Sequence, residues 1–295
     1  MELRDKAKLL FAWFNDHYEE MLGKIELIVN MDSFSHDGKD VNVLGETVCS
    51  FFEGTDFITE KAAKKECPED EPWQAELGNV FTARTHKKED GAGIVFLAHM
   101  DTVFPKGTAG KRPFYFDKEN DRAYGPGIVD MKSGLIMNIF VARALKELGL
   151  VSCPITLTFS PDEEIGSPSA LPVLQDELKN ALVSFCSEPG YVGNGVTIER
   201  KGSGHILLEI TGKSSHAGRA YAEGASAILE LAHKILAFDK YVDLSRDKTV
   251  NTGIIKGGTS ANSVAPNAMA SIHLTYKTLE EGERLVEAIK EEAAK

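Results

Sequence analysis

Ionisable side chains stand at the ends of three short apolar segments of this sequence. HMD (99–101) follows GIVFLA, DEE (162–164) follows ITLTFSP, and Glu188 follows ALVSFCS. Nearly continuous apolar runs of this length are typical of strands that are covered on both faces. Ligands bind at the carboxyl ends of the strands in an open α/β sheet. We therefore expect one histidine and several carboxylates to meet at one edge of such a sheet.

The spacing of His99 and Asp101 favours a metal-binding role over a structural one. Residues i and i+2 of a strand point to the same face, so the two side chains can lie side by side. A carboxylate bonded to the far ring nitrogen fixes the tautomer of a ligating histidine and raises its basicity. A single histidine at a strand end is most often structural, but His99 combines an acidic neighbour with two other aligned strand ends.

A further carboxylate, Asp130, lies in the segment AYGPGIVDMKSG, just before a helix predicted for 133–148. Gly125, Pro126 and Gly127 allow the backbone to turn tightly ahead of it. An acidic residue at this point could also stabilise the helix N-terminus through the helix dipole. The two roles are compatible, so Asp130 is a candidate metal ligand.

Glu163 and Glu164 are adjacent, and neighbours on a strand point to opposite faces. Both can face the site only if they lie in a loop after Pro161, which Asp162 and Gly166 permit. In such a loop, one carboxylate can bind a metal while the other acts as a general base. Adjacent acids are common on exposed loops, so the pair alone is weak evidence for a site. Its position directly after the apolar segment ITLTFSP is what favours a role in the site.

Two polar loops in the second half of the chain supply further candidates. GKSSHAG places His216 in a turn after a predicted strand, and GGTSANSVAPNA presents the amide of Asn262. His216 could equally be an exposed turn histidine. The remaining histidines have no acidic or glycine-rich context, and we predict structural roles for them: His17, His36, His86, His205, His233 and His273.

The elements that must position these residues divide the chain into two parts. The first thirty residues predict an amphipathic helix, 43–52 a second helix, and the charged segment 61–73 a surface loop. Strands and helices then alternate up to about residue 200, which is the α/β pattern. From 201 to 295 several strands and two helices, one over 225–238 and one at the end of the chain, predict a small α+β domain. We therefore expect domains at 1–200 and 201–295.

Composition narrows the function further. The 295 residues carry a formal net charge of −12, and an acidic surface repels phosphate backbones, so nucleic acid is not an expected partner. The four cysteines lack metal-binding or redox spacing and predict free thiols in a reducing compartment. No apolar segment predicts a signal peptide or a membrane span. A cytoplasmic protein that binds no membrane is the expectation.

The motifs HMDTV, YGPGIVDMKSG, PDEEIGS, SEP and SSHAG occur in the order and approximate spacing of the M20 zinc metallopeptidases and amidohydrolases. The sequence resembles this family over essentially its whole length, and most of all the bacterial glutamate carboxypeptidase branch. The resemblance implies an α/β, zinc-aminopeptidase-like catalytic domain with a mixed, largely parallel sheet. It also implies a smaller α+β lid domain through which two copies form a homodimer.

The same resemblance implies a site with two zinc ions. His99 and Glu188 would bind one ion and Glu164 the other, with Asp130 bridging the two. In complete members of the family a late histidine joins the second ion. This sequence ends at Lys295, within the predicted lid, and offers no candidate for that histidine, so the second zinc would lack a ligand here.

The resemblance also assigns catalytic roles. Glu163 would be the general base and Asp101 would orient the ligating histidine. His216 would stabilise the oxyanion, typically in the partner subunit's active site, and Asn262 would contact substrate. Thr275 stands where a substrate-binding arginine is expected, which removes a bidentate clamp for a substrate carboxylate.

We therefore expect zinc-dependent hydrolysis of an amide bond in a small peptide or an N-acyl amino acid, by a carboxypeptidase-like enzyme. The metal would lower the pKa of the attacking water, and Glu163 would take up its proton. Two alternatives stay open. The chain could be an N-acyl-amino-acid deacylase, because the chemistry is shared, or a catalytically inert dimerising fragment of such an enzyme.

Overall fold

The computed structural model describes residues 2–62, 72–87, 93–179, 181–190, 195 and 198–295. The chain forms two compact units, Met1–Gly190 and Tyr191–Lys295, where the sequence places a boundary near Arg200. Most of the predicted surface loop at 61–73, including Cys67, lies outside the described residues. Cys49 and Cys153 are free thiols.

The first unit is built on a mixed five-stranded sheet, which agrees with the predicted fold class. Its order is β1-β2-β6-β3-β7; β3, β6 and β7 are parallel, whereas β1 and β2 pair antiparallel. All six residues of β6 are buried, as its continuous apolar run predicts. The same prediction is wrong for β7, which lies at the edge of the sheet with five of its six residues exposed. The strand bounds are Ile58–Lys61 (β1), Phe81–Arg84 (β2), Gly93–His99 (β3), Ile155–Ser160 (β6) and Ala181–Cys186 (β7).

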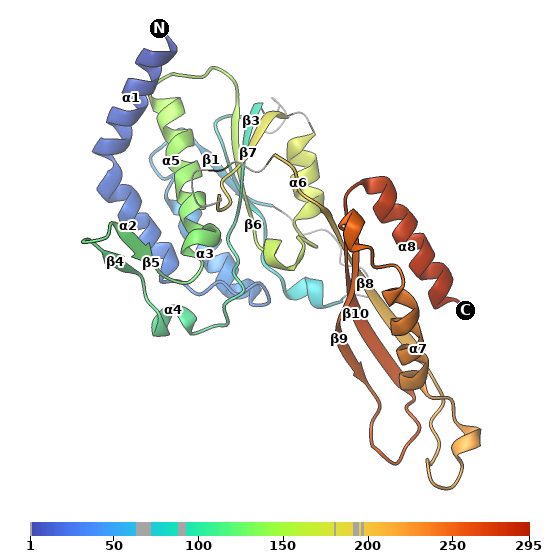
Figure 1. Cartoon of the computed structure of the whole chain (residues 1–295). Helices are drawn as coiled ribbons and strands as arrows, with labels where there is room; N and C mark the ends of the chain where they lie inside the picture. The colour runs from blue at the N-terminus through green and yellow to red at the C-terminus, as the bar shows by residue number, and fades with distance from the viewer. Residues whose placement is uncertain (1, 63–71, 88–92, 180, 191–194, 196–197) are drawn as a thin grey trace. The chain divides into compact units, whose positions relative to one another are not determined.

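Helices cover both faces of this sheet. Figure 1 shows α1 and α5 on one side and α6 on the other. The main core joins apolar side chains of α1, α2, α3 and α5 to the inner strands: Leu135 and Phe140 of α5 belong to the same buried cluster as Phe96 of β3 and Phe159 of β6. The helices are Leu3–Asp16 (α1), Tyr18–Val29 (α2), Gly38–Ser50 (α3), Thr108–Lys111 (α4), Ser133–Glu147 (α5) and Leu171–Leu178 (α6). A small hairpin pairs Tyr115–Asp117 (β4) with Arg122–Tyr124 (β5).

The N-terminal segment differs from its prediction. It forms two helices, α1 and α2, which meet at His17, where the backbone leaves helical geometry (φ −107°, ψ 9°). The ring of His17 stacks on Trp13 with centroids 3.8 Å apart, and its Nδ1 lies 2.7 Å from the Trp13 carbonyl oxygen. A side chain that bonds the backbone in this way competes with continuation of the helix, and hydrophobic spacing does not reveal it.

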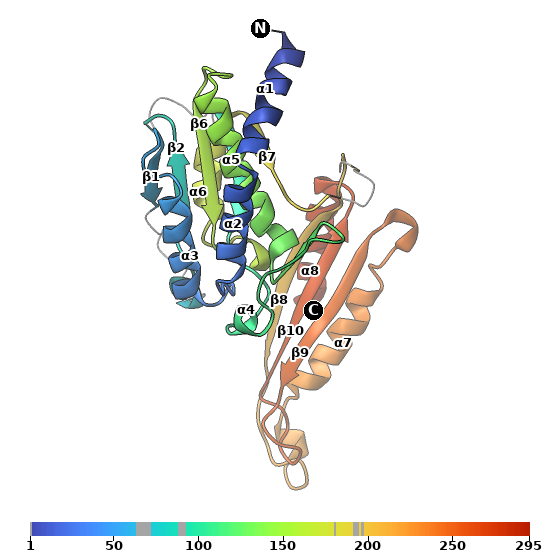
Figure 2. The same ribbon diagram turned by 90° about the vertical axis from the view of Figure 1, so that its left-hand side faces the viewer.

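The second unit is a three-stranded antiparallel sheet of order β8-β10-β9 with two helices on one face (Figure 2). Alternate residues of β8 and β10 point into its core, among them Ile206, Leu208, Ile272 and Leu274. The α+β pattern predicted after residue 200 is therefore present. The bounds are Gly202–Thr211 (β8), Thr249–Gly257 (β9), Asn267–Tyr276 (β10), Ala227–Asp239 (α7) and Leu279–Ala293 (α8).

Ser226 and Thr278 cap α7 and α8, respectively, by accepting hydrogen bonds from backbone N–H groups of the first turn. In the parts of the chain that the structure describes, every helix is too short or too polar to cross a bilayer.

Candidate metal centre

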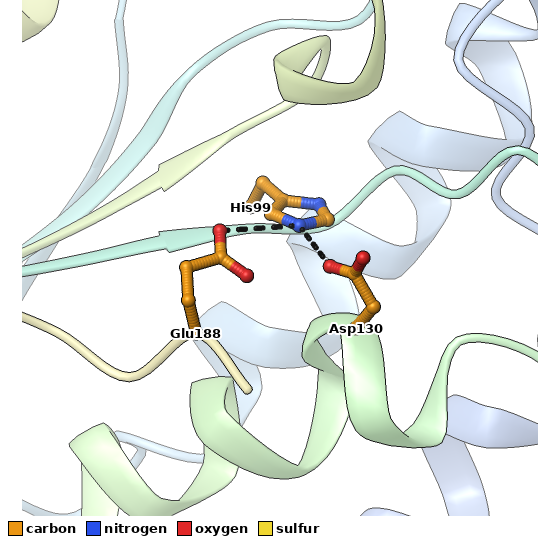
Figure 3. Close-up of side chains that lie close together, drawn as sticks. All are labelled: His99, Asp130 and Glu188. Atoms are coloured by element: carbon orange, nitrogen blue, oxygen red, sulfur yellow. Dashed lines mark hydrogen bonds and ion pairs between the residues drawn. The ribbon is translucent and has the colours of Figure 1, made fainter. Parts of the chain in front are cut away.

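Three side chains from separate parts of the first unit converge on one point (Figure 3). His99 Nε2 lies 3.0 Å from Asp130 Oδ1 and 3.6 Å from Glu188 Oε1. One ligand atom from each residue lies within 4.8 Å of the others. His99 is the last residue of β3, and Glu188 follows β7, its parallel neighbour. The shared sheet edge expected from the apolar segments therefore brings these two residues together.

Asp130 reaches the same point from a turn at Ile128–Lys132, immediately before α5. Its backbone is not helical (φ −120°, ψ 98°), so the carboxylate is aimed by the turn and not by a helix. Gly127 enters the turn with a left-handed φ of 69°, and a Cβ there would lie 2.5 Å from Thr102 Cγ2. Glycine is thus required both for the backbone conformation and for the space.

Lys132, a fully buried lysine, holds this turn against the end of α2. Its Nζ donates to the carbonyl oxygens of Ile28 (2.9 Å) and Met31 (2.7 Å) at the C-terminal end of α2. A cation is favoured there by the helix dipole. Burial lowers the pKa of Lys132 to about 8, while the nearby Asp32 carboxylate opposes this shift.

Asp101 is completely buried behind the ring of His99. Its Oδ1 lies 3.3 Å from His99 Nδ1, the ring nitrogen that faces away from Asp130. The same carboxylate accepts hydrogen bonds from Ser35 Oγ (2.6 Å) and from the backbone N–H groups of Glu163 (3.1 Å) and Glu164 (3.2 Å). Asp101 therefore both orients the ring of His99 and holds the backbone of Glu163 and Glu164 in place.

Glu163 and Glu164 lie in a single 3₁₀ turn, Glu163–Ile165, directly after β6. Asp162, fully buried, closes the loop that carries them: its Oδ2 accepts from Ser169 N (2.6 Å) and Ser169 Oγ (2.7 Å). Its backbone oxygen accepts from Ser167 N (2.7 Å). The irregular backbone that the adjacent acids require is thus provided by this closed loop.

The carboxylates of this cluster outnumber its cationic groups, and the pKa values of His99, Glu188 and Glu164 are all raised. Burial lowers the pKa of His99, but the Asp101 and Glu188 carboxylates outweigh it and raise the pKa to about 9. Burial, reinforced by Asp130, raises the pKa of Glu188 to about 7, and the same two causes raise the pKa of Glu164. A cation bound among carboxyl groups whose pKa is raised in this way would stabilise their charged form.

The donor set fits a zinc ion. Zinc in proteins binds imidazole nitrogen and carboxylate oxygen at about 2.0–2.2 Å, which separates adjacent tetrahedral ligand atoms by about 3.3–3.6 Å. The 3.6 Å from His99 Nε2 to Glu188 Oε1 lies within this interval, and the 3.0 Å to Asp130 Oδ1 is slightly shorter. Three protein ligands leave a fourth position open, as catalytic zinc sites require.

The two predicted site residues of the second unit lie next to each other. The Ala217 N–H donates to the Asn262 carbonyl oxygen (2.9 Å), and His216 pairs with Ser263 in an isolated bridge. Both His216 and Asn262 are exposed. Their predicted roles in catalysis and in substrate contact stay predictions.

Sequence reasoning missed Ser35 and Lys132 as residues that shape this centre, and it expected of Asp162 only that it permits an irregular loop. Asp162 and Lys132 stand inside the motifs PDEEIGS and YGPGIVDMKSG, so proximity to candidate ligands was an available signal. Ser35 had none, because its contact with Asp101 joins positions that are far apart in the chain.

Comparison with known proteins agrees with this geometry. The model of the peptidase family M20/M25/M40 matches residues 95–295. Carboxypeptidase G2 of Pseudomonas sp. (strain RS-16) is 27% identical over 98% of this chain and 67% of its own length. A putative succinyl-diaminopimelate desuccinylase of Mycobacterium tuberculosis is 31% identical over 68% of this chain and 56% of its own. The chain thus spans between about half and two thirds of the length of these relatives.

Solved structures share the fold. The di-peptidase Dug1p from Saccharomyces cerevisiae superimposes with a TM-score of 0.69 at 13% identity, covering 97% of this chain and 75% of that one. The family match extends over more than half of the sequence and includes every residue of the cluster at His99, Asp130 and Glu188. The chain therefore belongs to the peptidase family M20/M25/M40.

Proposed function

We propose that this protein is a zinc-dependent hydrolase of amide bonds with carboxypeptidase-like action on small peptides. The observation that carries the proposal is the cluster of His99, Asp130 and Glu188, whose ligand atoms lie within 4.8 Å of one another. The similarity to carboxypeptidase G2 over 98% of the chain supports the substrate class.

In this proposal His99, Asp130 and Glu188 would hold one zinc ion, and Asp130 and Glu164 would hold a second. The raised pKa of Glu164, to which Asp130 contributes after burial, supports a cation between these two carboxylates. Zinc bound here would supply a Lewis acid that lowers the pKa of a water molecule and polarises the substrate carbonyl.

Proton transfer in this proposal is assigned to Glu163. Glu163 lies near enough for its charge to raise the pKa values of His99 and Glu188, and its backbone is fixed by Asp101. Glu163 would take the proton of the attacking water and return it to the leaving amine nitrogen. His216 would donate a hydrogen bond to the oxyanion, and Asn262 would contact the substrate.

We also propose a homodimer that forms through the second unit, in which His216 serves the partner's site. The support is the fold of that unit and the family membership. The pairing of the His216 and Asn262 loops supports a joint role, because residues that act on one substrate must be presented together.

The second candidate is an N-acyl-amino-acid deacylase. It is favoured by the 31% identity to a putative succinyl-diaminopimelate desuccinylase. Thr275 does not distinguish the two candidates: its hydroxyl lies 2.6 Å from Thr249 Oγ1, so the position offers no bidentate clamp for the carboxylate that both kinds of substrate carry.

The test compares the zinc-loaded wild type with Glu163→Ala and with Glu119→Ala, a control at an exposed acid. We expect Glu163→Ala to retain zinc, measured by elemental analysis, and to lose about 10²–10⁴-fold in turnover. Faster hydrolysis of a peptidyl-glutamate than of an N-acyl amino acid would support the carboxypeptidase, and the reverse the deacylase. Near-normal turnover of Glu163→Ala would overturn the assignment of the base, and a zinc-loaded wild type without turnover would overturn the proposed function.

A further inference from the structure

Two histidines that look unremarkable in the sequence face each other in the second unit. His205 on β8 and His273 on β10 are directly paired across the sheet. Their ring centroids lie 4.9 Å apart with the planes at 61°. Their strand neighbours Ile206 and Ile272 point into the core under α7 and α8, so both rings lie on the opposite, open face. His205 is exposed and His273 half-buried.

The separation of the rings matches chelation of one metal ion. A ring nitrogen lies about 1.1 Å from its ring centre and binds zinc at about 2.0–2.1 Å, so each centre lies about 3.2 Å from the ion. Two imidazoles at ligand angles of about 90–109° then have centres about 4.5–5.2 Å apart. The observed 4.9 Å falls within this interval.

One ring is already held by a neighbour. Ser203, two residues before His205 on the same face, has its Oγ 3.0 Å from His273 Nε2. A hydrogen bond to one ring nitrogen fixes the orientation and tautomer of a ligating histidine and leaves the other nitrogen for the ion. On the other side, Asn251 of β9 is the strand partner of His273 and is exposed. Its amide oxygen is a further donor on the same row of the sheet.

We propose that His205 and His273 form a second cation site on the open face of this sheet, for a divalent ion that favours imidazole, such as Zn²⁺, Ni²⁺ or Cu²⁺. Two imidazoles with open positions suit these ions, whereas Mg²⁺ and Ca²⁺ require oxygen ligands. The site would join β8 to β10, and it is independent of the cluster at His99 because all of its residues belong to the second unit.

The test is a Ni²⁺ titration by equilibrium dialysis of the full chain. The variants are His205→Ala, His273→Ala and the double variant, with His233→Ala as a matched control at an exposed histidine on α7. We expect His205→Ala and His273→Ala each to bind one equivalent of nickel less than the wild type. The double variant should also bind one equivalent less, because both residues hold the same ion, and His233→Ala should bind as much as the wild type. Ser203→Ala should weaken this equivalent by about tenfold or more.

A His99→Ala variant separates this site from the proposed active centre, since it should lose a different equivalent and keep the one at His205. Equal nickel stoichiometry in the wild type and both single variants would overturn the proposal. So would a loss in only one of them, or an equal loss in His233→Ala. Unfolding midpoints measured in EDTA confirm that the variants fold, and replacement by glutamine in place of alanine repeats the test with a side chain of similar size.

Discussion

At the scale of single residues, Asp101 links the most interactions of the candidate metal centre. Its two carboxylate oxygens contact the ring of His99, the hydroxyl of Ser35 and the backbone N–H groups of two glutamates. All of these partners face it as donors. Because the carboxylate is fully buried, any donor that loses its acceptor cannot turn to water instead.

We therefore expect Asp101→Asn to weaken zinc binding by about 10–100-fold, the usual cost of removing a partner behind a ligating histidine. The asparagine amide presents a donor to groups that are themselves donors, so it cannot replace both oxygens. Affinity is measured by competition with a chromogenic chelator. Ser35→Ala is the matched control: it removes one hydrogen bond and should cost about 1 kcal/mol in the free energy of unfolding. Its zinc affinity should stay within a few-fold of the wild type, and wild-type affinity in Asp101→Asn would contradict the role of the carboxylate.

At the scale of elements, one buried ion pair ties α6 to the sheet. Arg84 on β2 donates to Glu177 on α6 (2.6 Å), and both side chains are almost fully buried. The guanidinium also bonds Thr82 Oγ1 (2.6 Å) and Glu60 (3.1 Å). α6 follows the loop that carries Glu163 and Glu164, so this pair anchors the helix that comes directly after that loop.

We expect Glu177→Leu to lower the free energy of unfolding by about 3 kcal/mol, since it leaves the guanidinium buried without its closest partner. The double variant Arg84→Met/Glu177→Leu should recover most of this loss, because a buried apolar pair avoids the cost of desolvating two charges. Urea unfolding monitored by circular dichroism measures both values. Glu60→Ala, which removes an exposed partner of the same arginine, should cost about 1 kcal/mol or less. A double variant as unstable as the single one would show that the pair is not the source of the loss.

At the scale of the whole molecule, the chain consists of two units with separate cores. The cluster at His99, Asp130 and Glu188 belongs to the first unit alone. An ion that binds only the folded form stabilises the unit that holds it, by about 2.7 kcal/mol at a free concentration one hundred times the dissociation constant.

Removal of zinc by EDTA should therefore shift one thermal transition of the chain to lower temperature and leave a second transition in place. Differential scanning calorimetry measures both, with free zinc buffered at nanomolar levels so that weaker two-histidine sites stay empty. His99→Ala should remove the shift. If chelation moves both transitions together, the two units do not unfold independently.

Much of this protein could be read from local sequence. The strands β3, β6 and β7, the helix after Asp130 and the polar residues at the strand ends follow from apolar runs and turn residues. The apolar run of β7 did not reveal that this strand lies at the sheet edge with its side chains largely exposed. These features depend on neighbours within a few residues, where periodicity and steric rules are strong. The break between α1 and α2 could not be read in this way, because a single side-chain bond at His17 decides it.

Whether the candidate ligands meet was decided by tertiary structure. The sequence determined that His99, Asp130 and Glu188 are polar groups at element ends, and the family motifs indicated their common purpose. Only the parallel register of β3 with β7, and the turn held by Lys132, bring their atoms within the reach of one ion. The histidine pair on β8 and β10 shows the same limit, since its two rings lie on strands far apart in the chain. Spacing along a chain fixes the direction of each side chain, whereas strand pairing fixes which of them become neighbours.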